Sequence, residues 1–196
     1  LPQSADNKMY LYFGNAAAVN GANAGATYDV NASAILHFAE TAGLPQDSTA
    51  YANQIVSGEV FSNPASIIGK GALLAGTAPL VIASAPQLEL DPTVGQTYQL
   101  WIKLDELPSA PAVIIARGDN NEFAINVDSA GIAAQFGSAT VSGTLTADAW
   151  RHLAVALAPN EMSLYVDGAK VATSEIELTA LGGAVYIGGA SDSGGL

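Results

Sequence analysis

The sequence has no cysteine, no long apolar run and no long segment with the period of a helix. Without cysteine, disulfide bridges, thiolate metal sites and cysteine nucleophiles are all excluded. A membrane-spanning helix needs roughly 20 consecutive apolar residues, and no run approaches that length, so we expect no direct insertion into a membrane. The lack of helical periodicity favours many short strands joined by turns.

Basic residues are also scarce. Six Lys and Arg stand against eighteen Asp and Glu, which gives the chain a net charge of −12. Nucleic acids and anionic lipids bind through clustered cations, so this balance argues against both as partners. Metal cations, neutral sugars and other proteins are partners that suit an acidic surface better.

The 196 residues, 49% of them hydrophobic, suffice for one large β domain or two small ones. Residues 8–16 alternate in the manner of a strand, with Gly14 and Asn15 forming a turn. The next stretch, 16–33, is rich in Ala, Asn and Gly, which is typical of a linker. We therefore predict that 1–33 is the end strand of a preceding domain plus a linker, and that 34–196 is one domain.

Short runs of alternating apolar and polar residues follow one another along the rest of the chain, with turns between them. Their regular spacing predicts an antiparallel β-sandwich. Before residue 97, strands are predicted at 34–40, 55–61, 71–76 and 79–84. After it, the predicted strands are 97–104, 112–118, 122–128, 131–137, 139–145, 150–157, 162–166, 169–176 and 184–190.

The hairpin WRHLAVALAPNEMSLYVDG at 150–168 carries the most specific pattern. Its Trp-x-His start, alternating apolar strand, polar turn and LYVDG ending resemble the laminin-G-like members of the concanavalin A-like lectin/glucanase superfamily. AILHFAE at 34–40 with QDST resembles the first strand and turn of that family, and TYQLWIKL at 97–104 resembles its strand that ends in Trp-x-Lys. The resemblance covers residues 34–190 and implies an all-β fold, an antiparallel jelly-roll β-sandwich of two curved sheets.

Members of this family normally continue into a closing strand with an Asp-Glu pair, whereas this sequence ends at SDSGGL. We therefore expect a sandwich that lacks its closing strand and has an exposed sheet edge. Such an edge invites strand exchange or dimer formation. We expect the segment MYLYFGN at 9–15 to add to a sheet of its own or of a neighbouring molecule.

MYLYFGNAAA at 9–18 resembles the last strand of a domain of unknown function that precedes laminin-G-like modules in some bacterial MotA/TolQ/ExbB proton channel family proteins. This resemblance implies a membrane-anchored parent in the bacterial cell envelope, with this chain on the periplasmic or extracellular side. The expected function is a non-enzymatic recognition or structural module. A carbohydrate-binding lectin is the alternative, followed by a glycan hydrolase or lyase.

Catalysis is not expected, because glucanases of this fold use a Glu-x-Asp-x-x-Glu pattern that the sequence lacks. Glu175 and Glu177 have the nearest spacing, which would point both carboxylates to one face of a strand. A solvated strand edge is the simpler interpretation. His37 and His152 lie between apolar residues of predicted strands without a Gly-x-Ser-x-Gly elbow elsewhere, and we interpret both as packing residues.

The resemblance implies Ca²⁺ as a cofactor at the rim of the sandwich. Hard cations take carboxylate and carbonyl oxygens from loops. The candidate ligands are Asp47, Asp119 and Asn121, with Asn120 in the same RGDNNE segment and Asp192 near the end. The alternative at each position is a side chain that caps a turn.

Aromatic side chains that could contact a glycan or protein ligand are few. Tyr51, in a predicted loop, and Tyr165, which faces away from its apolar neighbours, are the ligand-binding candidates. Trp101 and Trp150 are interpreted as core residues of their strands. The Arg-Gly-Asp sequence at 117–119 is interpreted as a hairpin turn rather than an integrin-adhesion motif.

Overall fold

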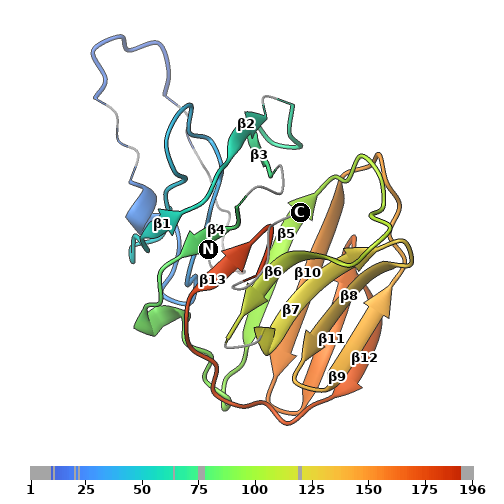
Figure 1. Cartoon of the computed structure of the whole chain (residues 1–196). Coiled ribbons are helices and arrows are strands. Elements are labelled where there is room, and N and C mark those ends of the chain that lie inside the picture. The colour runs from blue at the N-terminus through green and yellow to red at the C-terminus, as the bar shows by residue number, and fades with distance from the viewer. Residues whose placement is uncertain are drawn as a thin grey trace.

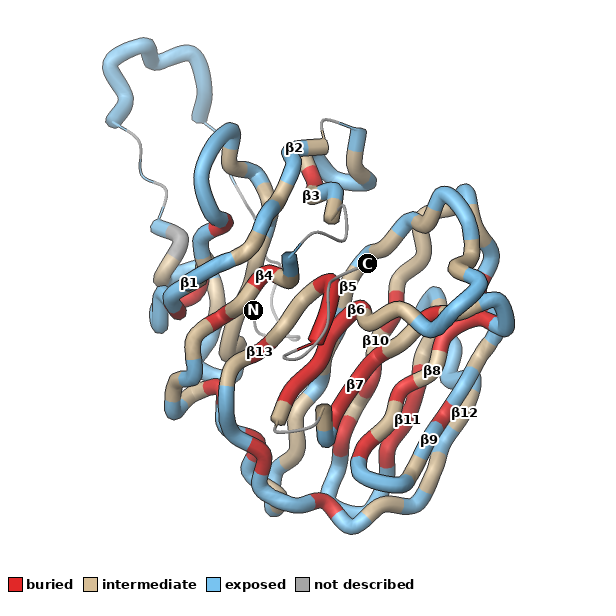
Figure 2. Tube along the Cα trace, in the orientation of Figure 1, coloured by how far each residue is buried: buried red, intermediate tan, exposed pale blue. Residues whose placement is uncertain are grey.

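The computed structural model describes residues 10, 12–19, 21, 23–63, 65–74, 78–118 and 121–190. Two antiparallel sheets of these residues face one another, and the core lies between them (Figures 1 and 2). Helical structure includes the short 3-10 turns η1 (Ala24–Ala26) and η2 (Pro86–Leu88). Within the described part of the chain, no helix is long and apolar enough to cross a membrane. The predicted all-β, antiparallel sandwich is confirmed.

One sheet has seven strands in the order β1-β4-β13-β6-β7-β8-β9, and the other has four in the order β12-β11-β10-β5. Strands β2 and β3 form a separate hairpin beside them. The strands are β1 (Ile55–Ser57), β2 (Phe61–Asn63), β3 (Gly71–Leu73), β4 (Leu80–Ile82), β5 (Gln96–Ile102), β6 (Ala112–Arg117), β7 (Phe123–Asp128), β8 (Gly131–Phe136), β9 (Ala139–Gly143), β10 (Arg151–Ala158), β11 (Glu161–Val166), β12 (Ala169–Glu175) and β13 (Val185–Ile187).

The inner face of the four-stranded sheet follows directly from residue alternation along β10. Leu153, Val155 and Leu157 are buried, and the residues between them are half-exposed. The register carries this pattern across the sheet, because Leu153 lies opposite Leu100 of β5 and Val166 of β11. Each such side chain, when fully buried, contributes roughly 1.5 to 3 kcal/mol. The alternation therefore fixes which face meets the other sheet.

The seven-stranded sheet supplies the opposite wall of the core from its central strands. Phe123, Ile125 and Val127 of β7 alternate inward and are almost completely buried. Ile132 of β8 lies opposite Val127, and Phe136 lies opposite Phe123. The buried residues of both sheets thus face one another across the centre of the molecule (Figure 2).

The turn between β11 and β12 shows how the outer strands are held in register. Asp167 and Gly168 both have positive φ, 50° and 81°, as a two-residue type I′ hairpin requires. The Asp167 carboxylate also accepts a hydrogen bond from the backbone N–H of His152 (3.0 Å) and one from Arg151 (2.7 Å). The hairpin is therefore fastened to the start of β10.

The strands predicted from residue 97 onward are confirmed, with ends that differ by a few residues, but the strand predicted at 34–40 is wrong. That segment contributes a single bridge between Leu36 and Asp47. Phe38 has a φ of 54°, in the left-handed region that an extended strand does not use. The N–H of Ile35 bonds to a side chain, the carboxylate of Asp47, instead of to another strand.

The N-terminal segment also differs from the prediction where it is described. Tyr10 and residues 12–16 form no strand and add to no sheet of the same chain. Tyr12 and Phe13 are about nine-tenths exposed, at 90% and 91%. The other residues of the predicted strand lie outside the described part. The domain boundary at residue 33, and addition of this segment to a neighbouring molecule, stay predictions.

Candidate functional site

The carboxylate of Asp47, the first predicted calcium ligand, accepts five hydrogen bonds from the loop around it. Oδ1 accepts from the backbone N–H groups of Ile35 (2.9 Å) and Thr49 (3.0 Å). Oδ2 accepts from the Thr49 hydroxyl (2.8 Å) and from the backbone and side-chain N–H groups of Asn53 (2.9 and 2.6 Å). Asp47 thereby organises the whole loop from Ile35 to Asn53.

These bonds decide the electrostatics of Asp47. Burial acts to raise its pKa, but the N–H groups of Ile35, Thr49 and Asn53 and the Thr49 hydroxyl outweigh burial, and the pKa lies below its usual value. A carboxylate offers about four lone-pair positions, so five protein donors leave none free for a metal ion. The geometry of Asp47 favours the turn-capping interpretation over a calcium ligand.

The remaining calcium candidates lie near the end of β6 and at the C-terminus. Asp119, Asn120 and Asp192 lie outside the described residues. Asn121 is half-buried, and its side-chain Oδ1 is buried without a hydrogen-bond partner. The described residues contain no group of three or more His, Asp or Glu that could hold a metal. A calcium site at Asn121 therefore stays a prediction.

Arg117, the first residue of Arg-Gly-Asp, is completely buried between the sheets. Its guanidinium donates to Gln96 Oε1 (3.0 Å) and to the Tyr98 hydroxyl (3.0 Å) of β5. It also donates to the carbonyl of Leu181 (3.2 Å). Because this side chain links β6 to β5 inside the core, it cannot contact an adhesion receptor, which excludes the adhesion interpretation.

The two predicted ligand-binding tyrosines belong to different parts of the fold (Figure 1). Tyr51 lies in the loop after Asp47 and donates its hydroxyl to the carbonyl of Val30 (2.9 Å). Tyr165 lies in β11, with the Lys170 ammonium 5.7 Å from its ring centroid. The structure does not bring the two tyrosines into one site, so each has to be judged by its own surroundings.

The outer face of the four-stranded sheet gathers aromatic and polar side chains. Trp101 of β5 lies opposite His152 of β10, with ring centroids 5.2 Å apart and ring planes at 58°. Trp101 is 47% exposed. In the next row, Gln99, Ala154 and Tyr165 lie side by side on neighbouring strands. We call these five residues the outer-sheet platform.

The outer-sheet platform has a small side chain at its centre, between larger ones. Ala154 has only a methyl group, and it separates Gln99 on β5 from Tyr165 on β11. Neighbouring strands are about 4.8 Å apart and successive residues about 3.4 Å, so the Cα atoms of Trp101 and Tyr165, two strands and two residues apart, are separated by about 12 Å. A sugar ring resting on Ala154 can touch Tyr165 on one side and the amide of Gln99 on the other, with Trp101 on the diagonal.

Charged side chains at the margin of the platform are paired with one another. Lys170 bonds Glu161 (2.9 Å) and Arg151 bonds Asp167 (2.7 Å). Hydrogen bonds from Lys170 and Ser163 lower the pKa of Glu161 to about 2. Exposed ion pairs of this kind add little stability. Because each pair joins one positive and one negative side chain, the two pairs add no net charge at the margin of the platform.

The exposure of Trp101 corrects its interpretation as a core residue. Its neighbours Leu100 and Ile102 pack against the core, and alternation along a strand places Trp101 on the opposite face. That pattern in the sequence could have identified it. His152 does pack, as expected, against the exposed Trp101. The outer face of β10 is half-exposed.

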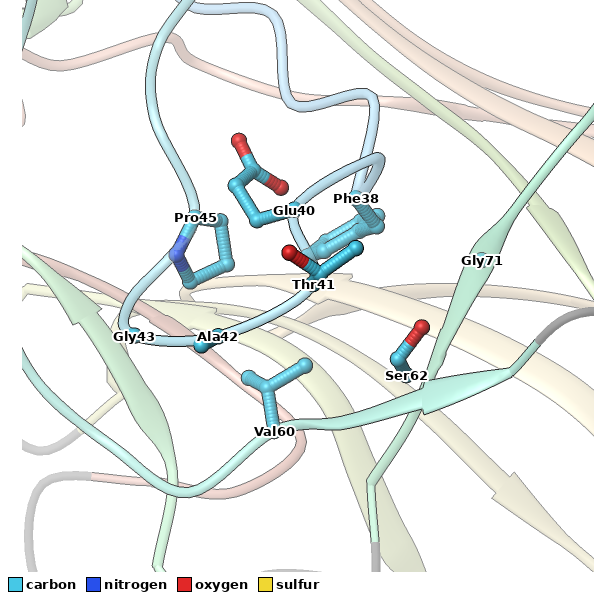
Figure 3. A pocket seen from close by; sticks show the side chains of 9 residues that line it. All are labelled: Phe38, Glu40, Thr41, Ala42, Gly43, Pro45, Val60, Ser62 and Gly71. Atoms are coloured by element: carbon cyan, nitrogen blue, oxygen red, sulfur yellow. The ribbon is translucent and has the colours of Figure 1, made fainter.

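The other candidate sites fit a ligand less well. Figure 3 shows a hollow where the loop 38–45 meets β2 and β3, with Phe38, Glu40 and Ser62 in its lining. Its volume of about 50 Å³ suits water rather than a sugar. An open hollow of about 430 Å³ beside Asp47 is larger, but no aromatic side chain lines it. The first hollow is too small for a sugar ring despite Phe38, and the second has no aromatic side chain on which a sugar could stack.

The carboxylates considered for catalysis are dispersed at the end of β12. Glu175 is the last residue of that strand and lies opposite Glu161, while Glu177 lies beyond the strand. Both Glu175 and Glu177 are exposed. That the chain is not an enzyme stays a prediction.

Comparison with known proteins places most of the chain in one family. The family described as the concanavalin A-like lectin/glucanases superfamily matches residues 75–195, more than half of the sequence. This range contains every strand from β4 to β13. No curated protein sequence matches the chain. The match begins later than the resemblance at 34–190, so the assignment of 34–74 to the same domain stays a prediction.

Solved structures with a similar fold come from larger proteins. Trypanosoma rangeli sialidase in complex with sialic acid has a TM-score of 0.62 and 18% identity, over 81% of this chain and 27% of the sialidase. Domain 4 of AbnA, an extracellular arabinanase from Geobacillus stearothermophilus bound to arabinotriose, has a TM-score of 0.50 and 16% identity, over 71% of each chain. Botulinum neurotoxin type C, whose cell entry depends on two ganglioside molecules, has a TM-score of 0.55 and 16% identity, over 83% of this chain and 44% of the toxin. At these identities the likeness shows the fold.

Proposed function

Because the chain belongs to the concanavalin A-like lectin/glucanase superfamily, we propose that it is a non-catalytic recognition module that binds a carbohydrate on the outer-sheet platform. The observation that carries the proposal is the 47% exposure of Trp101 beside His152. An indole ring on a regular strand is rigid, and its face can stack on the apolar face of a sugar ring. Gln99 and His152 offer hydrogen bonds to sugar hydroxyls.

The names of two similar structures support a carbohydrate as the ligand class. The sialidase holds sialic acid and the arabinanase domain holds arabinotriose. Fold alone is a poor guide to function, so the argument rests on the exposed aromatic side chains of this chain. A protein ligand is the other occupant that the same surface could take.

The chemistry of the platform argues for binding without turnover. A glycosidase needs a carboxylic acid whose pKa is raised enough to protonate the leaving oxygen near neutral pH. The carboxylate of Asp167 accepts a hydrogen bond from the backbone N–H of the platform residue His152, and this bond and one from Arg151 hold its pKa below the usual value. It is ionised at neutral pH and engaged by two donors, so it is unsuited to act as that acid.

A glycan array tests this proposal directly. We expect the wild-type chain to bind a defined set of glycans, and Trp101→Ala to weaken that binding at least tenfold, which corresponds to about 1.4 kcal/mol. Ile68→Ala removes a side chain that is 81% exposed in the connection between β2 and β3, and serves as the matched control. It should leave binding unchanged.

Two further arms separate the alternatives. If Tyr51→Ala abolishes binding while Trp101→Ala does not, the ligand binds at the rim and the platform is the wrong site. Loss of binding in EDTA would support the calcium prediction at Asn121. Release of sugar from a bound polysaccharide, abolished by Glu175→Gln or Glu177→Gln, would contradict the non-catalytic assignment.

We propose further that the parent protein is a bacterial envelope protein of the MotA/TolQ/ExbB proton channel family, with this module on the periplasmic or extracellular side. The resemblance of residues 9–18 supports this context. The complete reading frame tests it. A membrane-spanning proton-channel region in the same protein would support the assignment, and fusion to a cytosolic enzyme would contradict it.

A further inference from the structure

Asn31 is the one asparagine of the sequence that has a Ser or Thr two positions later, and Ala32 stands between it and Ser33. Asn-x-Ser/Thr, with any residue except proline at x, is the acceptor pattern for N-linked glycans. Bacterial N-linking oligosaccharyltransferases also require an acidic residue two positions before the asparagine, and Asp29 occupies that position. The segment DVNAS therefore satisfies the stricter of the two acceptor patterns.

The structure places this segment in an exposed turn. The backbone N–H of Ala32 donates to the carbonyl of Asp29 (3.1 Å), which closes a β-turn with Val30 and Asn31 at its tip. Asp29, Val30 and Asn31 are all exposed, and Val30 is 78% exposed. No described strand pairs with the residues of this turn. Because a transferase has to bind the acceptor segment along its own backbone, a surface turn is accessible to it, whereas a strand inside a sheet is not.

The side-chain amide of Asn31 is available for reaction. The backbone N–H of Asn31 donates to Oδ1 of Asp29 (2.8 Å), as in an Asx-turn. The side-chain amide of Asn31 forms no hydrogen bond with another residue in the described part of the chain. Both Asp29 and Asn31 are exposed, so a single turn presents the acidic group and the acceptor amide to solvent together.

Hydrogen bonds on both sides of Asn31 hold the turn at the surface. The Tyr51 hydroxyl donates to the carbonyl of Val30 (2.9 Å), and the side chain of Asn53 donates to the carbonyl of Ser33 (2.7 Å). Figure 1 shows η1, which directly precedes this segment, beside β1 and away from β10, β11 and β12. A glycan on Asn31 would therefore lie apart from the outer-sheet platform and leave the platform open to a ligand.

We propose that Asn31 is an N-glycosylation site, modified by a membrane-bound oligosaccharyltransferase of the bacterial envelope. Nδ2 of Asn31 attacks the anomeric carbon of an oligosaccharide that is linked to a polyprenyl diphosphate. A C–N bond forms, the bond from that carbon to the phosphate oxygen breaks, the polyprenyl diphosphate leaves, and Nδ2 gives up one proton to the transferase. The transferase recognises the Ser33 hydroxyl and the Asp29 carboxylate. This site rests on the proposed envelope location and is independent of carbohydrate binding by the platform.

Intact-mass spectrometry of the exported chain tests the site. A signal peptide directs the chain to the periplasm of bacteria that contain an N-linking oligosaccharyltransferase and its polyprenyl-diphosphate oligosaccharide. We expect the wild type to gain the mass of one oligosaccharide, and Asn31→Gln and Ser33→Ala to lose that gain completely. Ser33→Thr retains a hydroxyl and should retain the glycan. Asn160→Gln is the matched control, because Asn160 is exposed but has no Ser or Thr two positions later, and this variant should also retain the glycan.

Asp29→Asn tests the acidic position separately. Asparagine keeps an oxygen that can accept from the N–H of Asn31 but carries no charge, so the circular dichroism spectrum should stay unchanged while most of the glycan is lost. Full modification of this variant would contradict the role of Asp29.

Two outcomes would overturn the site itself. One is a wild-type chain that stays unmodified in cells that modify a second exported acceptor protein, and the other is a glycan that persists in Asn31→Gln. Because the signal peptide supplies export, these outcomes judge Asn31 whatever the complete reading frame shows about the parent protein. The assay contains no carbohydrate-binding step, so it is also separate from the glycan array.

Discussion

The carboxylate of Asp47 accepts the hydrogen bond of the Ile35 N–H, which a backbone carbonyl would accept in a regular strand. It also positions Asn53, whose side chain donates to the carbonyl of Ser33 (2.7 Å) and accepts from the side chain of Gln87. This chain of bonds connects the loop after residue 33 to η2. A single side chain therefore holds together a segment that has very little regular secondary structure of its own.

Replacing Asp47 with Asn should destabilise the protein. The side-chain amide of the introduced Asn keeps one acceptor oxygen and replaces the other oxygen with an NH2 group, which only donates. Some of the N–H groups of Ile35, Thr49 and Asn53 therefore lose their acceptor. Part-buried donors left without a partner cost about 1 to 3 kcal/mol, and we expect the free energy of unfolding to fall by about 2 kcal/mol. Urea denaturation followed by tryptophan fluorescence measures the loss.

Asp29→Asn provides the control for this substitution. Asp29 is exposed, and its carboxylate accepts a hydrogen bond from the backbone N–H of Asn31. The change should be within about 0.5 kcal/mol of the wild type. Equal losses for both variants would contradict the special role of Asp47. Stabilisation of the wild type by added Ca²⁺ that Asp47→Asn abolishes would indicate a metal ligand instead.

At the scale of elements, the junction where β5 meets β10 depends on one glycine. Gly95 has a φ of 89°, and a Cβ atom there would lie 2.1 Å from the carbonyl oxygen of Leu157. That oxygen belongs to the backbone of β10, so it cannot move without disturbing the ladder. The entry into β5 therefore requires a residue without a side chain.

A comparison of Gly95→Ala with Gly168→Ala distinguishes the cost of a positive φ for alanine from the cost of a steric clash. Both glycines have positive φ, but no heavy atom lies within 4 Å of a Cβ at Gly168. Gly168→Ala should cost about 1 kcal/mol, the penalty of a left-handed conformation for alanine. Gly95→Ala should cost about 3 kcal/mol or more, because the clash with Leu157 adds to the same strain. Thermal unfolding compares them, and equal melting temperatures would show that crowding at Gly95 is irrelevant.

The strands that could be predicted are those in which an apolar residue stands at every second position. In β10, Leu153, Val155 and Leu157 repeat at the period of a strand, and the structure follows this pattern. The segment 34–40 has a similar alternation but forms a loop: the Ile35 N–H bonds to the Asp47 carboxylate, and Phe38 has a positive φ. A side chain that replaces a neighbouring strand as hydrogen-bond partner does not change the alternation of apolar and polar residues in the segment. The sequence pattern therefore could not reveal this error.

At the scale of the whole molecule, several carboxylates have pKa values below the usual range. Besides Asp47, they are Asp91, Asp167 and Glu161, the last at about 2. Hydrogen bonds from Thr93 lower the pKa of Asp91, and those from His152 and Arg151 lower the pKa of Asp167. Unfolded Asp and Glu have pKa values of about 3.9 and 4.3, so the unfolded chain binds protons first as the pH falls.

Stability should therefore decrease in acid. The part of the stability that comes from these hydrogen-bonded carboxylates is fully present above about pH 4.5. It is lost as the pH falls toward the lower pKa values of the folded state, because the unfolded chain binds protons more readily. Urea denaturation midpoints at neutral pH and through the acid range measure this trend. A midpoint that stays constant or rises in acid would contradict it, and would indicate that relief of the repulsion among the acidic groups outweighs these hydrogen bonds.

The candidate site was less predictable than the fold, for reasons that concern single residues. The exposure of Trp101 follows from the alternation of Leu100 and Ile102, and Tyr165 was placed on the outer face by the same logic. What the sequence does not contain is the pairing of β5 with β10, which brings His152 beside Trp101. Arg117 is a comparable case, because its acceptors Gln96 and Leu181 are distant in sequence and meet it only in the folded core.

The pairing of β5 with β10 also has a consequence for the time course of folding. Ile102 has to find Arg151 after the intervening strands β6 to β9, whereas β10 and β11 are joined by a short turn and can pair early. Sheets dominated by such distant contacts fold slowly, in milliseconds to seconds. Until β10 arrives, the edge of the uncharged β5 that β10 covers is free, so refolding at high protein concentration should lose chains to aggregation through this strand.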